Sequence, residues 1–171
     1  EQELLKGLSA WQTELVLLQT IPGIDIMGAA MLLVEISAEM QNFGSAERLA
    51  SWVGLCPGNN ESAGKRETGK TRKGNAWVRR LLCEFALAAW RSRCALRDKF
   101  AALSIRKGHE KSIVALAHKM LRIVFAVLEN KTPYRDKVVD CEALSVQRNA
   151  PRWMKMLIEH GCTPTAAPGA A

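Results

Sequence analysis

Apolar residues recur at intervals of three and four along most of the chain, and no useful stretch alternates with a period of two. This spacing is typical of amphipathic helices, so the sequence predicts an all-α fold. The first residues carry an a/d pattern that consists of Leu4, Leu8, Trp11, Leu15 and Leu18. The pattern favours a helix that pairs with another helix, but a surface helix packed on its own domain produces it equally well. We expect residues 1–20 to form the end of a coiled-coil-like helix.

Start and stop residues divide the rest of the chain into further helices. Pro22 and Gly23 end the first helix, and an almost wholly apolar helix, expected to be buried, is predicted from Met27 to Glu39. The hydroxyl of Ser45 is placed to cap the next helix. This helix and the later ones are predicted over residues 45–53, 75–94, 97–105, 110–129 and 151–160. We expect about five helices to form a compact bundle over residues 21–130, followed by a peripheral tail of residues 131–171.

The turn between the first two helices has a second interpretation. The sequence IPGID at Ile21–Asp25 resembles a helix-hairpin-helix motif, in which backbone N–H groups of the turn face a nucleic-acid phosphate. Asp25 stands where that motif usually has its second glycine, and a carboxylate repels a phosphate. Two interpretations stay open: Gly23 contacts DNA through its backbone, or the segment is a tight turn between helices.

The stretch from Gly54 to Leu82 interrupts the helical pattern with glycines, small hydroxyl residues and cations. Loops of this length are uncommon in a compact domain unless they bind or catalyse, because ordering them costs entropy and buries little apolar surface. Only Glu61 and Glu67 offset its positive charge. We predict that this basic loop lies on the surface and binds nucleic acid through Lys65, Arg66, Lys70, Arg72, Lys73, Asn75, Arg79 and Arg80.

The whole-chain composition agrees with a nucleic-acid partner. The 171 residues include 24 Lys and Arg against 17 Asp and Glu, which gives a formal net charge of +7. The five cysteines are scattered and odd in number, which favours a reducing cytoplasm over a disulfide framework. No apolar run has the length of a membrane span. The first residues resemble the middle of an element, so we expect the chain to begin inside a longer protein.

Two motifs in the basic loop point to different chemistry. GKRETGKT at residues 64–71 matches the phosphate-binding loop of nucleotide hydrolases, whose mechanics require a strand before the first glycine and a helix that begins at the lysine. The sequence around Lys70 and Thr71 supplies neither. Ser62, among small residues and cations, is the alternative: cations lower the energy of a serine alkoxide and of the transition state for attack on a phosphodiester. Many loop serines only bond local backbone.

Longer segments carry a family resemblance. In order they are LLQTIPGIDIMGAAMLLVEI, FGSAERLASWVGLCPGNNESAGK, TRKGNAWVRRLL and KGHEKSIVALAHKMLRIVFAVL, between residues 17 and 128. Together they resemble the C-terminal transposase domain of the insertion-sequence IS-one-ten family, which includes the Piv-type invertases. The resemblance implies that Ser62 attacks DNA and becomes covalently linked to it during recombination guided by a structured bridge RNA. In that family an upstream RuvC-like domain holds divalent metal, Mg²⁺, through four acidic residues.

The resemblance also implies a homo-oligomer, a dimer or tetramer, that acts on DNA in a bacterial cytoplasm at the nucleoid. No acidic constellation in this sequence replaces the RuvC-like carboxylates, and no Cys or His spacing fits a metal site, so we expect no metal bound by this chain. The chain then corresponds to the C-terminal part of a recombinase. The alternative is a module that binds nucleic acid and oligomerises without chemistry of its own, and a P-loop NTPase is the least favoured function.

Overall fold

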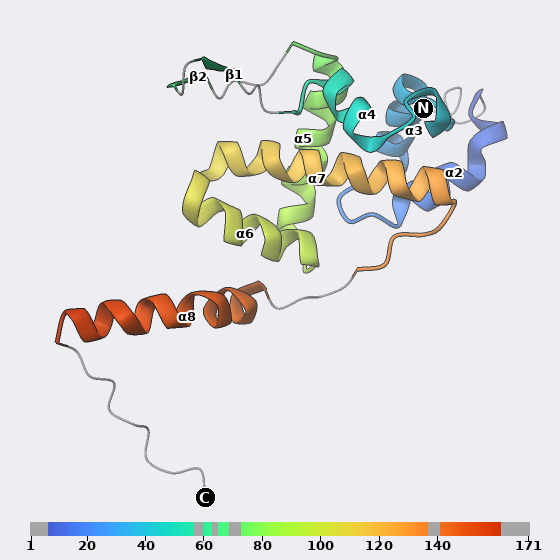
Figure 1. The fold of residues 1–171 in the computed structure, drawn as a ribbon. Coiled ribbons are helices and arrows are strands. Elements are labelled where there is room, and N and C mark those ends of the chain that lie inside the picture. The colour runs from blue at the N-terminus through green and yellow to red at the C-terminus, as the bar shows by residue number, and fades with distance from the viewer. Residues whose placement is uncertain (1–6, 57–59, 63–64, 69–72, 137–140, 162–171) are drawn as a thin grey trace, which may run out of the picture.

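The structure is a computed structural model that describes residues 7–56, 60–62, 65–68, 73–136 and 141–161 (Figure 1). Within these residues the α-helices are α2 (Gln12–Gln19), α3 (Ile26–Ile36), α4 (Ala46–Val53), α5 (Ala76–Arg91), α6 (Ala95–Lys107), α7 (His109–Asn130) and α8 (Cys141–Glu159). Two 3-10 helices, η1 (Ser9–Trp11) and η2 (Met40–Asn42), and two short strands, β1 (Asn60–Ser62) and β2 (Lys65–Thr68), complete the described elements. The predicted all-α bundle is confirmed. No described helix is long and apolar enough to cross a membrane.

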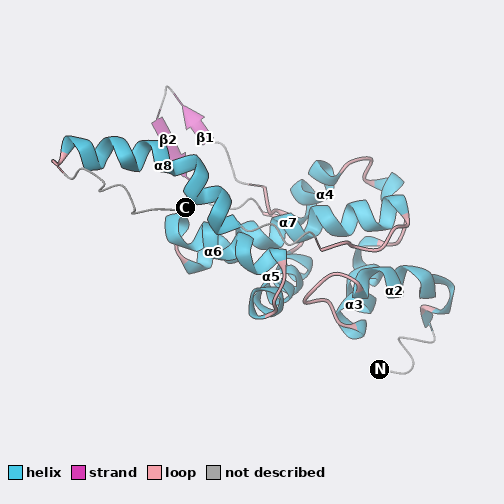
Figure 2. Cartoon of the chain, turned by 90° about the horizontal axis from the view of Figure 1, so that it is seen from below, coloured by secondary structure: helices cyan, strands magenta, loops and turns pink. Residues whose placement is uncertain are grey.

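Helix α7 lies at the centre of the bundle and packs against α2, α4, α5 and α6 (Figure 2). Its inward face includes Leu116, Met120, Leu121, Val124 and Leu128, each at most 1% exposed. Burying one such side chain fully contributes about 1.5–3 kcal/mol relative to leaving it in water. Because α4 and α5 both pack on α7, this helix fixes the two elements between which the basic loop runs.

The N-terminal apolar pattern is used inside the bundle. Leu8, Leu15 and Leu18 are buried in the main core, and Trp11 packs against it. Leu4 lies outside the described residues. In the described residues, the a/d pattern therefore belongs to a helix that packs on its own domain.

The turn between α2 and α3 lies against α5. Gly23 has a φ of +89°, and a Cβ at this position would come within 2.5 Å of the Phe85 carbonyl oxygen. Asp25 caps α3, because its Oδ1 accepts a hydrogen bond of 2.8 Å from Gly28 N. These contacts explain both residues as parts of a tight turn between helices, and contact of Gly23 with DNA remains a prediction.

Several helix boundaries differ from those predicted. Helix α3 was expected to reach Glu39 but ends at Ile36, because Ser37 takes a left-handed φ of 63° that a right-handed helix cannot continue. The C-terminal helix was expected to begin at Pro151, but α8 begins at Cys141 and contains this proline. Proline disfavours a helix interior without forbidding it, so here it was a misleading start signal.

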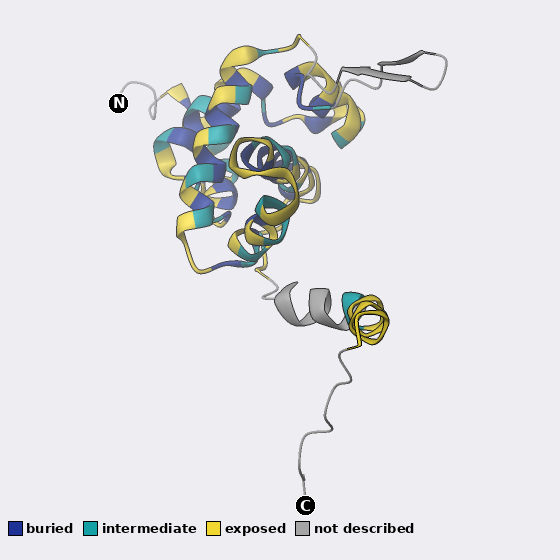
Figure 3. Ribbon diagram, turned by 90° about the vertical axis from the view of Figure 1, so that its left-hand side faces the viewer, coloured by how far each residue is buried: buried dark blue, intermediate teal, exposed yellow. Residues whose placement is uncertain are grey.

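A strap of residues 131–136 crosses the bundle between α7 and α8. Lys131 Nζ lies 2.6 Å from Glu14 Oε1, and Tyr134 N donates to Thr20 Oγ1 at 2.8 Å. Both carboxylate oxygens of Asp136 accept from Ala95 N at 3.2 Å. These bonds fix the strap to α2 and to the start of α6. Figure 3 shows that the residues of α8 whose burial is described are mostly exposed.

Candidate nucleic-acid interface

The basic loop starts and ends at one place on the bundle. Gly54 caps the end of α4 with a φ of 79°, and Asn75 N donates a 3.1 Å hydrogen bond to Trp52 O. Gly74 lies so close to this turn that a Cβ on it would be 2.5 Å from both Gly54 N and the Val53 carbonyl carbon. The two ends of the loop are therefore joined backbone to backbone, as in an Ω-loop.

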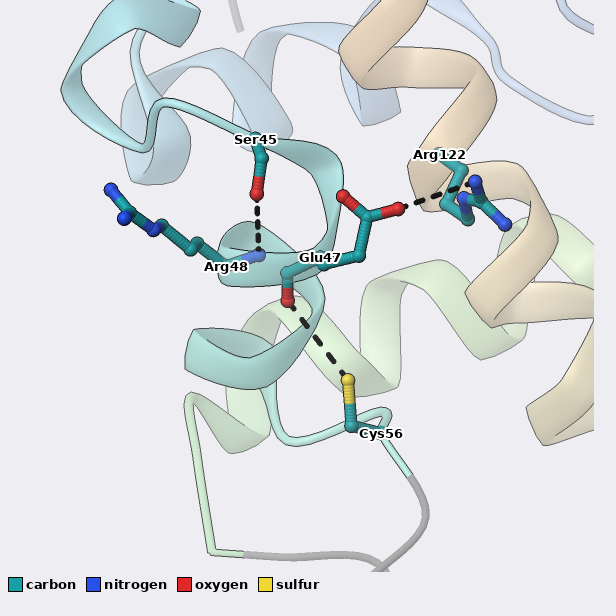
Figure 4. A network of polar contacts seen from close by, with 5 residues as sticks. All are labelled: Ser45, Glu47, Arg48, Cys56 and Arg122. Carbon is teal, nitrogen blue, oxygen red and sulfur yellow. Dashed lines mark hydrogen bonds and ion pairs between the residues drawn. The ribbon is translucent and has the colours of Figure 1, made fainter.

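The first end of the loop is also attached through α4. Glu47 Oε1 lies 3.3 Å from Arg122 Nη2, which joins α4 to α7, and Cys56 Sγ lies 4.0 Å from the Glu47 carbonyl oxygen (Figure 4). Ser45 Oγ accepts from Arg48 N at 3.3 Å, which confirms the predicted cap of α4. Both partners of the ion pair are more than half exposed, so the pair itself adds little stability.

The second end of the loop is fixed by Asn75. Its Oδ1 accepts from Val78 N at 3.1 Å and so caps α5, and its Nδ2 donates to Glu35 Oε2 at 3.0 Å. Both the oxygen and the nitrogen of the Asn75 amide are thus hydrogen-bonded to other residues of the bundle. Asn75 was predicted to bind nucleic acid; the structure gives it a capping and bridging role, and its contact with nucleic acid remains a prediction.

The loop itself contains a β-hairpin that the sequence did not predict. Strands β1 and β2 are antiparallel, with Ser62 opposite Lys65 and Glu61 opposite Arg66. The register shifts between Asn60 and Glu61, which leaves one extra residue on β2. The strands have three and four residues, too few for a period of two to be recognised. The hairpin lies away from the helices, beyond the end of α5 at which the loop is joined (Figure 1).

The two arginines in the second turn of α5 differ. Arg80 Nε lies 3.3 Å from Glu84 Oε1 in an exposed i,i+4 pair, which a phosphate can replace at little cost. Arg79 is half-buried. Burial raises the pKa of the neighbouring Cys83 thiol, and the charge of Arg79 partly opposes this rise. Cys83 is therefore a protonated, partly buried thiol at neutral pH.

The remaining predicted residues are spread over the chain. Lys73 is exposed at the joined ends of the loop, whereas Lys70 and Arg72 lie outside the described residues. Gly23 contacts α5 at Phe85, ten residues beyond Asn75 and so about 15 Å along the helix axis. The structure therefore does not bring Gly23 to the place where the loop is joined.

The nucleotide-binding alternative conflicts with the fold. Strand β2 occupies the variable positions of GKRETGKT, which in a phosphate-binding loop wrap around the phosphates. Helix α5 begins at Ala76, too late for a helix that should start at Lys70. The sequence MLLVE at residues 31–35, which partly matches the Walker B motif that accompanies such loops, lies inside α3 rather than in a strand. The described residues contain no group of three His, Cys, Asp or Glu side chains able to hold a metal ion.

The sequence analysis missed two features of the chain that bear on nucleic-acid binding. One is Gly74, whose tight contact with Gly54 could have been suspected only because the two glycines bracket the loop. The other is a second basic segment with seven cations against Asp98 and Glu110. Its cations are all exposed, and none has an ion pair in the part of the chain described: Arg91, Arg93, Arg97, Lys99, Arg106, Lys107 and Lys111.

Comparisons with known proteins point to one family. The sequence profile described as Transposase IS116/IS110/IS902 family matches residues 15–101. The chain is 29% identical over 140 residues to the transposase for insertion sequence element IS1111A of Coxiella burnetii, covering 78% of this chain and 38% of that protein. It is 31% identical over 126 residues to the pilin gene-inverting protein of Moraxella bovis, covering 71% and 39%. The IS110 uncharacterized 43.6 kDa protein of Streptomyces coelicolor is 30% identical over 124 residues, covering 71% and 30%. The chain thus spans about a third of the length of these curated relatives.

Proposed function

Because the chain belongs to the IS116/IS110/IS902 transposase family, we propose that it supplies the serine nucleophile and part of the DNA-binding surface of a transposase or recombinase. The observation that carries the proposal is the construction of the basic loop. Its ends are joined at Gly54 and Gly74, and between them it bears a hairpin in which Ser62 pairs with Lys65. A rigid base that displays a short hairpin is suited to place one hydroxyl against one phosphodiester.

In the proposed reaction Ser62 Oγ attacks the phosphorus of a DNA phosphodiester. An Oγ–P bond forms, the bond from phosphorus to one deoxyribose oxygen breaks, and that oxygen leaves as a hydroxyl group. Lys65 is the register partner of Ser62 in the hairpin, and we assign to it the stabilisation of the charge that develops on the phosphate. The energy stored in the phosphoserine linkage allows a second DNA hydroxyl to reverse the attack and complete strand exchange.

The other cations of the loop are assigned to binding rather than to chemistry. Lys65, Arg66 and Lys73 with the α5 residue Arg80 would neutralise backbone phosphates, and each contact makes affinity more sensitive to salt. Lys70 and Arg72 are included from the sequence alone. The exposed second basic segment, which runs from the end of α5 through α6 to the start of α7, provides further positive surface.

The proposal places metal chemistry and guide recognition outside the described residues. These residues contain no candidate metal cluster. By family resemblance, carboxylates elsewhere in a longer protein would hold a divalent cation, and a structured RNA would select the target. A homo-oligomer is part of the same proposal, because strand exchange between two duplexes requires more than one nucleophile.

A non-catalytic module that binds nucleic acid is the second candidate, favoured by the basic surface alone. The two candidates differ in what Ser62→Ala does to the longer protein. As a nucleophile, Ser62 is required for strand cleavage and transfer, while DNA affinity hardly changes because one neutral hydroxyl adds little to ground-state binding. Thr71→Ala in the same loop is the matched control. Strand transfer that survives Ser62→Ala but is lost with Thr71→Ala would reject the assignment.

A further inference from the structure

Trp77 is an exposed aromatic residue at the base of the basic loop. It lies in the first turn of α5, three residues after Gly74, and is 53% exposed. Within the part of the chain that the structure describes, its ring contacts no other aromatic ring and its indole N–H has no hydrogen-bond partner. Trp52 at the same junction differs, because its ring packs on Phe43 with 5.6 Å between the ring centroids. A single exposed apolar residue is normal on a protein surface, so the groups around Trp77 decide what it can bind.

The indole of Trp77 forms one wall of a small cavity between α3 and α5. The cavity has a volume of about 230 Å³, and its other walls are Met31 from α3 and Arg80, Leu81 and Glu84 from α5. Met31 and Leu81 are apolar, whereas Arg80 and Glu84 carry charges. The space is therefore sufficient for a flat ring that lies beside the indole and has polar groups within reach of its edge.

Arg80 and Glu84 supply a hydrogen-bond donor and an acceptor in this cavity. Their side chains are 76% and 58% exposed and form an i,i+4 pair of 3.3 Å, which can exchange partners at little cost. The edge of a nucleobase carries both donors and acceptors, and its face stacks on aromatic side chains. An indole beside a guanidinium and a carboxylate therefore matches a nucleobase, whereas an apolar side chain of a protein partner would use neither charge.

The other charges near Trp77 also favour a nucleotide. Lys73 is exposed four residues before Trp77, and Arg80 is exposed three residues after it. Of the nearby carboxylates, Glu35 accepts a 3.0 Å hydrogen bond from the amide that caps α5, and Glu84 is paired with Arg80. Cations before and after an aromatic ring can bind the phosphates of a strand while one of its bases stacks on the ring.

A base can stack on a protein side chain only after it leaves its own helix, because neighbouring base pairs cover both faces of a paired base. Strand exchange creates such bases, since the cleaved strands separate from their partners. We propose that Trp77, together with Arg80 and Glu84, holds one unpaired base of a DNA strand that the basic loop binds. The inference rests on the proposed binding of DNA by this loop, and it adds a site for a base to the contacts with phosphates.

The first test compares a perfect DNA duplex with the same duplex carrying a short mismatched bubble. The 171-residue chain should bind the bubble more tightly, and Trp77→Ala should lower this affinity about 5- to 150-fold, through loss of one stacked base. Trp77→Phe should keep most of the affinity, because a phenyl ring also stacks. Both variants should bind the perfect duplex within about twofold of the unaltered chain, since the loop cations remain; this also shows that they are folded.

Trp153→Ala is the matched control. Trp153 lies on α8, away from the cavity residues in sequence, and is 47% exposed. This variant should bind both DNAs as the unaltered chain does. The inference is overturned if Trp77→Ala keeps the full preference for the bubble, if it weakens binding of both DNAs equally, or if an RNA bubble is preferred where the DNA bubble is not.

Photochemical cross-linking locates the base directly. A 5-iodouracil in the bubble forms a bond with an aromatic side chain that contacts it, and tandem mass spectrometry of the digested product identifies the residue. We expect the cross-link at Trp77, and a cross-link at Trp52 or Trp153 instead would overturn the inference. Binding of the perfect duplex and covalent attachment of DNA to Ser62 are measured separately, so failure of the base site is distinguished from failure of the proposed function.

Discussion

The joined base of the basic loop predicts that Gly74 cannot be replaced even by alanine. The added Cβ would lie 2.5 Å from Gly54 N and from the Val53 carbonyl carbon, whereas ordinary van der Waals contact begins at 3.4 Å. Both neighbours are backbone atoms, so no side chain can rotate away, and the two ends of the loop must separate by about 1 Å. The hydrogen bond from Asn75 N to Trp52 O, 3.1 Å long, crosses the same junction and would be stretched or broken.

The expected cost follows from these two effects. Overpacking of this kind costs about 1–3 kcal/mol, and loss of the hydrogen bond adds about 0.5–1.5 kcal/mol. For a domain of this size each kcal/mol lowers Tm by about 2–4 °C. Gly74→Ala is therefore expected to lower Tm by about 3–18 °C in calorimetry and to weaken DNA binding, because the hairpin loses its fixed position.

Gly7→Ala is the matched control. Nothing lies within 4 Å of a Cβ at Gly7, and its φ is not in the left-handed region. This change should leave Tm unchanged or slightly raised, since alanine reduces the freedom of the unfolded chain. If Gly74→Ala has the same Tm and DNA affinity as Gly7→Ala, the two ends of the loop are not joined as described.

Three further predictions concern the cap, a histidine and the loop cations. Asn75→Ala should destabilise the chain by about 0.5–2 kcal/mol through loss of the α5 cap. Asn75→Asp should recover only part of this stability, because it places a carboxylate beside Glu35. Urea unfolding measures the free energy of unfolding of both variants, and equal stability of the two variants and the unaltered chain would contradict the capping role. Burial, with a smaller contribution from Arg122, lowers the pKa of His118 below its ordinary 6.5. The unfolded chain then binds more protons than the folded chain just below pH 6.5, so the free energy of unfolding should fall on acidification through this range and should fall less in His118→Gln; identical pH profiles would contradict it. Replacing Lys70 and Arg72 together by alanine should reduce the slope of log K for duplex DNA against log salt by about two, and an unchanged slope would remove both residues from the interface.

Most of the helices could be predicted from local features of the sequence. Spacings of three and four located α4, α5, α6 and α7, and the hydroxyl of Ser45 marked a helix start that the structure confirms. The family resemblance is also confirmed, because the family profile matches residues 15–101. The features that the sequence left open depend on contacts between distant segments. The a/d pattern of the first residues could not reveal whether its partner was another chain or, as for Leu15 and Leu18, the core of the same bundle.

The sequence predicted the position of the basic loop but not the β-hairpin within it. Its composition located the segment, while the β-hairpin depends on pairing between strands too short to leave a periodic signal. Asn75 illustrates a second limit. An amide that can bind a nucleic acid can equally cap a helix and bond a carboxylate, and only the positions of Val78 and Glu35 distinguish these roles. The full length of α8 was not predicted, because Pro151 was taken as the start of a helix that in fact continues through it from Cys141.

If Ser62 is the nucleophile, it becomes covalently joined to DNA, and the linkage can be located in the protein. A protein that contains this chain together with the proposed metal-binding domain would be incubated with its DNA substrate, denatured and digested with nuclease and protease. The peptide that carries a nucleotide would then be sequenced by tandem mass spectrometry. We expect a nucleotide phosphate on Ser62 that disappears in Ser62→Ala and persists in Thr68→Ala. A nucleotide attached to Thr68, Thr71 or another residue, or recombination without any attached nucleotide, would contradict it.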